Sequence, residues 1–69
     1  MGVLRKSRAI EGVTQWEMAE RVGKSVTAIS SYENNEERVP MAIYRRWYSQ
    51  LQEEAARRFF LDELIGTFV

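Results

Sequence analysis

Apolar residues recur at helical spacing in the first half of the chain, and residues that favour a helix start precede each run. Thr14 is a good N-cap, and Glu17 three residues later completes a capping box, so a helix is predicted to begin at Gln15. The spacing places three residues on the buried face of this helix: Met18, Ala19 and Val22. Gly23 is predicted to end it, because glycine adopts a left-handed conformation at the lowest cost.

A second short helix follows directly, with Ser25 as its predicted N-cap and Ile29 and Tyr32 on its buried side. Its outward face consists of Val26, Thr27, Ser30 and Ser31. This face is uncharged and is built from small side chains. The stretch from Thr14 to Asn34 therefore predicts two helices joined by a tight turn.

Helices are also expected before and after this pair. The first is predicted over residues 3–10, ends at Gly12, and has three apolar anchors: Val3, Leu4 and Ile10. Asn35 is expected as a left-handed C-cap of the third helix, and Pro40 marks the start of the next one. No period-two alternation or hairpin turn occurs, so the sequence predicts no strand.

The second half of the chain contains neither glycine nor proline from Met41 to Ile65. An unbroken helix of about 25 residues would be about 37 Å long, which exceeds the size of so small a core. Its apolar positions form two stripes. The first contains Ile43, Tyr44, Trp47, Tyr48, Leu51 and Ala55, and the second contains Phe60, Leu61, Leu64, Ile65 and Phe68.

In an unbroken helix the second stripe is rotated from the first by roughly 110° and has nothing in its own chain to cover. We therefore expect it to form a homodimer interface. The alternative is a kink near Gln52 that folds the tail back and makes these residues ordinary core. The aromatic residues Trp16, Tyr44, Trp47 and Tyr48 are expected in the core or at its rim.

Many spaced positions together resemble the Cro/repressor-type helix-turn-helix family of phage, plasmid and bacterial regulators. They are Arg8, Gly12, Thr14-Gln15, Met18-Ala19, Val22-Gly23, Ser25, Ile29, Glu33-Asn34, Pro40 and Leu51. The resemblance implies an all-α, lambda-repressor-like DNA-binding domain of four to five helices, with a long or extended C-terminal helix. The chain is then a single domain over residues 1–69, with a core over 1–51 and a dimerisation helix over 52–69.

The family resemblance also implies roles for individual residues. The helix after Ser25 would lie in the DNA major groove, with Val26, Thr27, Ser30 and Ser31 reading bases. Phosphate contacts would come from Gln15, Lys24, Asn34 and Arg38. Arg8 and Glu33 match a structural ion pair. Glu36 and Glu37 depart from the commonly basic loop of the family and would repel DNA.

Composition modifies this interpretation. Ten basic residues balance ten acidic ones, whereas a DNA-binding domain is usually basic. The chain contains no Cys and no His, and its acids are scattered, so we expect no enzyme activity, no metal site and no cofactor. No segment is long and apolar enough to span a bilayer, and no signal peptide pattern opens the chain, so a cytoplasmic protein is expected.

The leading hypothesis is a sequence-specific regulator of double-stranded DNA, a homodimeric repressor that occupies a palindromic operator. No activation or ligand domain is evident in the sequence, which favours repression. The alternative is a protein-interaction module on the same scaffold, similar to an antitoxin or antirepressor. The zero net charge, the acidic pair and the apolar tail keep this alternative open.

Overall fold

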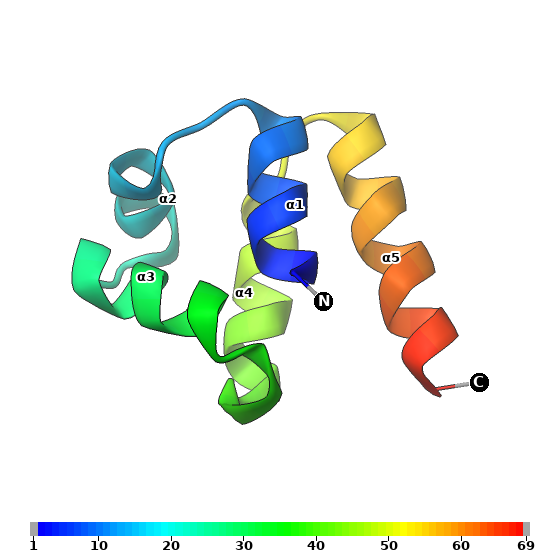
Figure 1. The fold of residues 1–69 in the computed structure, drawn as a ribbon. Coiled ribbons are helices and arrows are strands. Elements are labelled where there is room, and N and C mark those ends of the chain that lie inside the picture. The colour runs from blue at the N-terminus through cyan, green and yellow to red at the C-terminus, as the bar shows by residue number, and fades with distance from the viewer. Residues whose placement is uncertain (1, 69) are drawn as a thin grey trace.

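The computed structural model describes residues 2–68 of the backbone and the side chains of residues 2–66, and this part consists of helices joined by short turns and loops, with no strand (Figure 1). Its elements are α1 (Val3–Glu11), α2 (Gln15–Val22), α3 (Val26–Asn34), the 3-10 helix η1 (Glu36–Arg38), α4 (Met41–Gln50) and α5 (Glu54–Phe68). The all-α prediction is confirmed. In Figure 1, α2 and α3 lie to one side of α1, and α5 lies to the other.

The predicted caps explain why α2 and α3 begin where they do. The Thr14 hydroxyl accepts the backbone N–H of Glu17 at 3.1 Å, and the Ser25 hydroxyl accepts that of Ala28 at 3.1 Å. Each cap satisfies an N–H that has no partner inside its own helix. Gly23, between the two helices, has a φ of 80°, which a residue with a Cβ adopts only with strain.

The expected left-handed cap at Asn35 is wrong. Its backbone has φ −145° and ψ 54°, and the chain continues from it directly into η1. In the 3-10 turn, the Asn35 carbonyl accepts the backbone N–H of Arg38, and the Glu36 carbonyl accepts that of Val39. The turn therefore ends α3 without a residue at positive φ.

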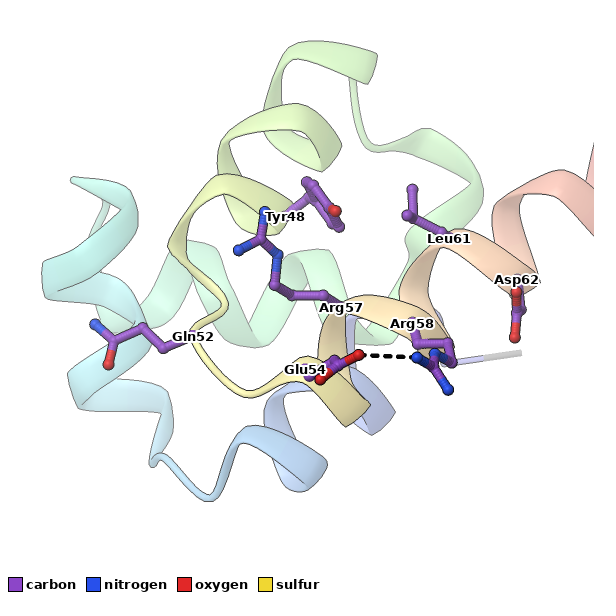
Figure 2. A pocket seen from close by; sticks show the side chains of 7 residues that line it. All are labelled: Tyr48, Gln52, Glu54, Arg57, Arg58, Leu61 and Asp62. Carbon is purple, nitrogen blue, oxygen red and sulfur yellow. Dashed lines mark hydrogen bonds and ion pairs between the residues drawn. The ribbon is translucent and has the colours of Figure 1, made fainter.

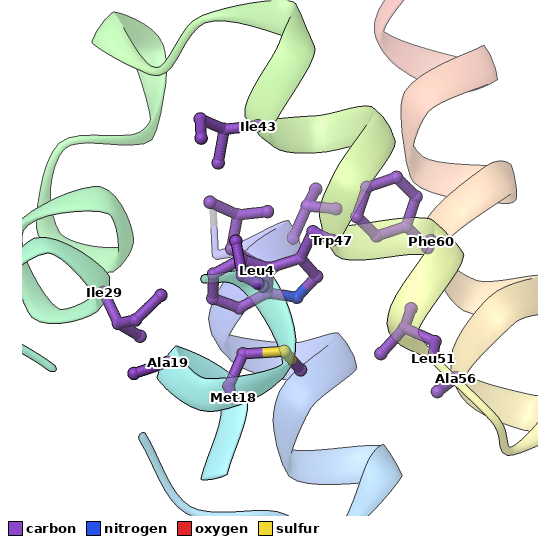
Figure 3. Close-up of a cluster of buried hydrophobic side chains, with 11 residues drawn as sticks. Leu4, Met18, Ala19, Ile29, Ile43, Trp47, Leu51, Ala56 and Phe60 are labelled. Carbon is purple, nitrogen blue, oxygen red and sulfur yellow. The ribbon is translucent and has the colours of Figure 1, made fainter. Parts of the chain in front are cut away.

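Trp47 lies at the centre of the core and is fully buried (Figure 3). Its indole N–H donates to the Ser7 hydroxyl at 3.1 Å, and that hydroxyl donates to the Leu4 carbonyl at 3.0 Å. This pairing satisfies the polar atoms that accompany so large a buried side chain.

Two residues that were expected in the core or at its rim lie outside the core, since Ile10 is 42% exposed and Trp16 is 72% exposed.

Of the two arrangements left open for the segment from Met41 to Ile65, the structure has the break near Gln52 and not the unbroken helix. The chain leaves α4 after Gln50 and turns through residues 51–53, and α5 then packs along α1. The turn buries Phe60, which is 1% exposed and lies against the rings of Tyr44 and Tyr48 at centroid distances of 6.2 and 5.6 Å. Phe60 is therefore a core residue of its own chain, and its assignment to a dimer interface is wrong.

The break between α4 and α5 depends on a carboxylate from the other end of the chain. Glu11 accepts the backbone N–H groups of Gln52 and Glu53, each at 2.9 Å, which lie where α5 begins. Arg21 donates to Glu11 at 2.7 Å and to the Gln50 carbonyl at 3.1 Å, where α4 ends. The side chain of Glu11 is only 2% exposed. These contacts satisfy the helix ends at the turn, so no glycine or proline is needed there.

The Glu11→Ala substitution should lower the free energy of unfolding by about 2 kcal/mol, because it leaves the backbone N–H groups of Gln52 and Glu53 without their acceptor. It also removes one carboxylate partner of Arg21, which keeps its pair with Glu17. Urea denaturation followed by circular dichroism measures this change. Glu54→Ala serves as the control, since Glu54 forms an exposed pair with Arg58, and it should cost less than about 1 kcal/mol. Equal effects of the two substitutions would contradict the role given to Glu11.

Candidate functional site

The outward face of α3 is open to solvent at its centre. Thr27 and Ser31 are exposed, whereas Val26 and Ser30 are partly buried. Val26 packs in part against the hydrophobic core, so it offers less apolar surface than an exposed valine would. The face therefore presents hydroxyl groups that can either donate or accept hydrogen bonds. At the start of the helix, the methyl groups of Val26 are partly accessible.

The four residues expected to contact phosphate lie on separate elements around α3. Gln15 opens α2 and is partly buried, and Lys24 is exposed in the turn before α3. Asn34 ends α3, and Arg38 ends η1, and both are exposed. Gln15 and Lys24 thus precede α3 in the chain, Asn34 is its last residue, and Arg38 follows it.

Arg8 and Glu33 are brought together beneath this surface. The Arg8 guanidinium donates to both carboxylate oxygens of Glu33, at 2.5 and 3.1 Å, and to the Val13 carbonyl at 3.0 Å. The Glu33 side chain is completely buried and that of Arg8 is 17% exposed. Gln15 also donates its side-chain amide to Glu33, at 3.0 Å. One buried carboxylate therefore links α1, the start of α2 and the end of α3.

The charge state of Glu33 follows from these partners. Burial raises the pKa of its carboxyl, but the hydrogen bonds from Arg8 and Gln15 and the charges of Arg8 and Arg5 outweigh burial and lower the pKa below the usual 4.5. Glu33 is consequently ionised at neutral pH. A buried carboxylate with bidentate pairing of this kind fixes the orientation of the helix that carries it.

Glu36 has a structural contact that its sequence position did not reveal. Its carboxylate accepts the backbone N–H of Leu4 at 3.1 Å and thereby caps the first turn of α1. Its carbonyl accepts the Tyr44 hydroxyl at 3.0 Å. Burial, followed by the charges of Glu36 and Glu37, raises the pKa of Tyr44. The acid expected to repel DNA thus also holds α1 against the loop after α3.

The residues expected at a dimer interface are divided by the structure. Leu61 and Ile65 are 42% and 59% exposed on α5, Leu64 is partly buried against the core, and Phe60 is fully buried. The side chain of Phe68 lies outside the described residues. The exposed part of the stripe is therefore smaller than the sequence predicted.

A shallow hollow lies between α4, the turn and α5 (Figure 2). The Arg57 guanidinium lies 5.0 Å from the centre of the Tyr48 ring, and Arg58 pairs with Glu54 at 2.8 Å. Leu61 and Asp62 line its other side. This mixture of an ion pair, an aromatic ring and a leucine resembles a helix surface rather than a reaction centre.

No three His, Cys, Asp or Glu residues among the described residues are close enough together to hold a metal ion. None of the described helices combines the length and apolar character that a bilayer crossing requires.

Acid should destabilise the fold through Glu33 and Glu11. Arg21, Glu53 and Gln52 outweigh the effect of burial and lower the pKa of Glu11 as well. Because both folded-state pKa values lie below the unfolded ones, their stabilisation is complete above about pH 4.5 and is lost as pH falls through the folded values. When urea unfolding is measured from pH 7 to pH 3, the urea concentration at the midpoint should decrease once the pH is below about 4.5. This decrease should be less steep in the Glu33→Gln variant. An equally steep fall in that variant would contradict the role of Glu33.

Comparison with known protein families agrees with this geometry. A helix-turn-helix family model, of the Cro/C1 type, matches residues 4–43, which is more than half of the chain and includes α1 to α3 and the start of α4. No curated protein and no solved structure matches the chain significantly. The chain therefore belongs to the helix-turn-helix family of DNA-binding regulators.

Proposed function

We propose that the protein is a sequence-specific regulator of double-stranded DNA that acts as a dimeric repressor by occupying a palindromic operator in the bacterial cytoplasm. One observation carries the proposal: Thr27 and Ser31 are exposed on a helix whose far end is locked to the scaffold by the buried Glu33. A recognition helix has to be both accessible and fixed, because base contacts depend on accurate placement.

The side chains on this face suit a particular kind of readout. Thr27 can donate or accept through its hydroxyl and can pack its methyl on a thymine methyl, and Ser31 can donate or accept. Val26 offers a further apolar contact for thymine. Ser30 is partly buried, as is Val26. This set favours an operator in which thymine methyl contacts carry much of the discrimination.

Electrostatic attraction contributes less here than in most DNA-binding domains. The chain has no net charge, and Glu37 is exposed next to Arg38. Affinity for random DNA should therefore be modest, since non-specific binding comes almost entirely from phosphate neutralisation. Binding of a selected site should exceed this background by a wide margin.

Dimer formation is proposed through the exposed end of α5. Leu61 and Ile65 are exposed residues of α5, and α5 lies on the other side of α1 from α2 and α3 in Figure 1, so a twofold contact through α5 would leave α3 free in both protomers. Repression by occupancy then requires only that the dimer hold its operator tightly.

A second candidate function is binding of a protein partner. A groove between α4 and α5 is lined mainly by apolar side chains: Met41, Tyr44, Arg45, Tyr48, Phe60, Leu61 and Leu64. Exposed apolar surface of this kind can accept a helix from another protein. This function would replace DNA binding, as in an antitoxin-like or antirepressor module, or would accompany it.

Selection from random duplexes tests the proposed function directly. The protein should enrich a palindrome whose half-site centres are about one helical turn, or about 34 Å, apart, and binding should weaken as salt rises. Failure to enrich any sequence would refute the proposal and favour the protein-interaction function.

The recognition residues should separate from the phosphate residues in binding assays. Thr27→Ala should relax or shift the preferred sequence and cost about 1–3 kcal/mol on the selected site, because a base contact is lost. Gln15→Ala should weaken selected and random duplexes alike. Fluorescence anisotropy on both duplexes measures the difference. A change of preference in Gln15→Ala but not in Thr27→Ala would contradict the assignment.

The α5 contact is tested by introducing a charge at its most exposed position. Ile65→Asp should convert dimers to monomers in sedimentation, with the fold retained, because an isologous interface places the new charge against its own copy. Ile10→Asp is the matched control, since Ile10 is also exposed but lies on α1. A wild-type protein that is monomeric at high concentration would disprove the dimer.

A further inference from the structure

Arg5 lies beside two residues expected to contact phosphate. Its side chain is 55% exposed on α1, and its guanidinium donates to the side-chain oxygen of Asn34 at 2.7 Å. Its Nε lies 3.6 Å from Oε1 of Glu33. A basic residue on the first helix would ordinarily be a solvated surface charge, but here the end of α3 holds it in place.

The same Glu33 oxygen orders a second group. Oε1 of Glu33 accepts hydrogen bonds from Arg8 at 3.1 Å and from the Gln15 amide at 3.0 Å. The Gln15 amide and the Arg5 guanidinium, which forms an ion pair with this oxygen at 3.6 Å, therefore lie against one buried atom. Each retains unused donors, because an amide nitrogen carries two hydrogens and a guanidinium carries five. Because the oxygen of Asn34 faces Arg5, its amide nitrogen is available as a further donor.

The charge of this cluster favours an anion despite the buried carboxylate. Arg8 pairs with Glu33 through two hydrogen bonds, which compensates its charge, and the positive charge of Arg5 remains. Arg8 is largely buried, whereas more than half of the Arg5 side chain is exposed. Arg5 is therefore the guanidinium of this cluster that can reach a phosphate.

We propose that Arg5, Gln15 and Asn34 form a preassembled site for a backbone phosphate of duplex DNA, with Glu33 as the positioning residue beneath it. This inference rests on the proposed function and adds to it a contact from α1. A site whose donors are already ordered loses little conformational entropy on binding, so it raises affinity without adding base discrimination.

The salt dependence of DNA binding tests the proposal. Arg5→Gln should weaken binding to selected and random duplexes about tenfold, the loss expected for one charge-assisted hydrogen bond. The slope of log K against log salt should become shallower by about one for each protomer, with the preferred sequence unchanged. Arg5→Lys should restore the slope but only part of the affinity, because lysine keeps the charge and lacks the planar fork.

Lys6→Gln is the matched control. Lys6 is the next residue of α1 and carries the same charge, but it lies about 100° further around the helix. Its loss should leave the slope unchanged, and circular dichroism should show that all three variants keep their helix content. A wild-type slope in Arg5→Gln, or an equal loss in Lys6→Gln, would overturn the phosphate site while leaving DNA binding intact. A wild-type protein that binds no duplex would overturn both the site and the proposed function.

Discussion

The buried carboxylate of Glu33 is the contact on which the DNA-binding half of the molecule depends. It receives Arg8 from α1 and Gln15 from α2 while it belongs to α3 itself, so three helices are held relative to one another by one side chain. Its net contribution to stability is small by the usual balance of desolvation and attraction. Its consequence is orientational: α3 is held so that Thr27 and Ser31 remain exposed.

A second buried acid, at the last residue of α1, performs a similar task. Glu11 holds the start of α5 through two backbone N–H groups and is itself held by Arg21 of α2. The helix-turn-helix and the tail are thereby joined through α1, and α5 completes the core by burying Phe60. The large apolar side chains that remain exposed on α5 include Leu61 and Ile65.

The sequence predicted those features that depend on neighbouring residues. The starts of α2 and α3 were predicted because Thr14 and Ser25 cap N–H groups three residues away. The break after α4 stayed one of two alternatives, because the acceptor that stabilises it, Glu11, lies 41 residues from Gln52 in the sequence. Once the break is present, the second apolar stripe divides between core and surface, which periodicity alone cannot foresee.

In the candidate site, too, the sequence predicted the features set by neighbouring residues and not those set by contacts between distant residues. The outward face of α3 follows from helical spacing, but the partial burial of Val26 depends on packing against the core. Arg5 could not be distinguished from Lys6 by sequence, since both are basic residues of one helix. The contact of Arg5 with Asn34, 29 residues away, separates them. Tertiary contacts, which the sequence does not show, therefore determine that the side chain of Arg5 is held in place by Asn34.

Backbone amide chemical shifts of the labelled protein, followed while a selected duplex is added, would locate the surface that DNA contacts. The largest shifts should occur at the start of α2 and along α3, and smaller shifts should occur in α5. Shifts confined to α4 and α5, with α3 unaffected, would contradict DNA recognition by α3 and would identify the groove between α4 and α5 as the functional surface.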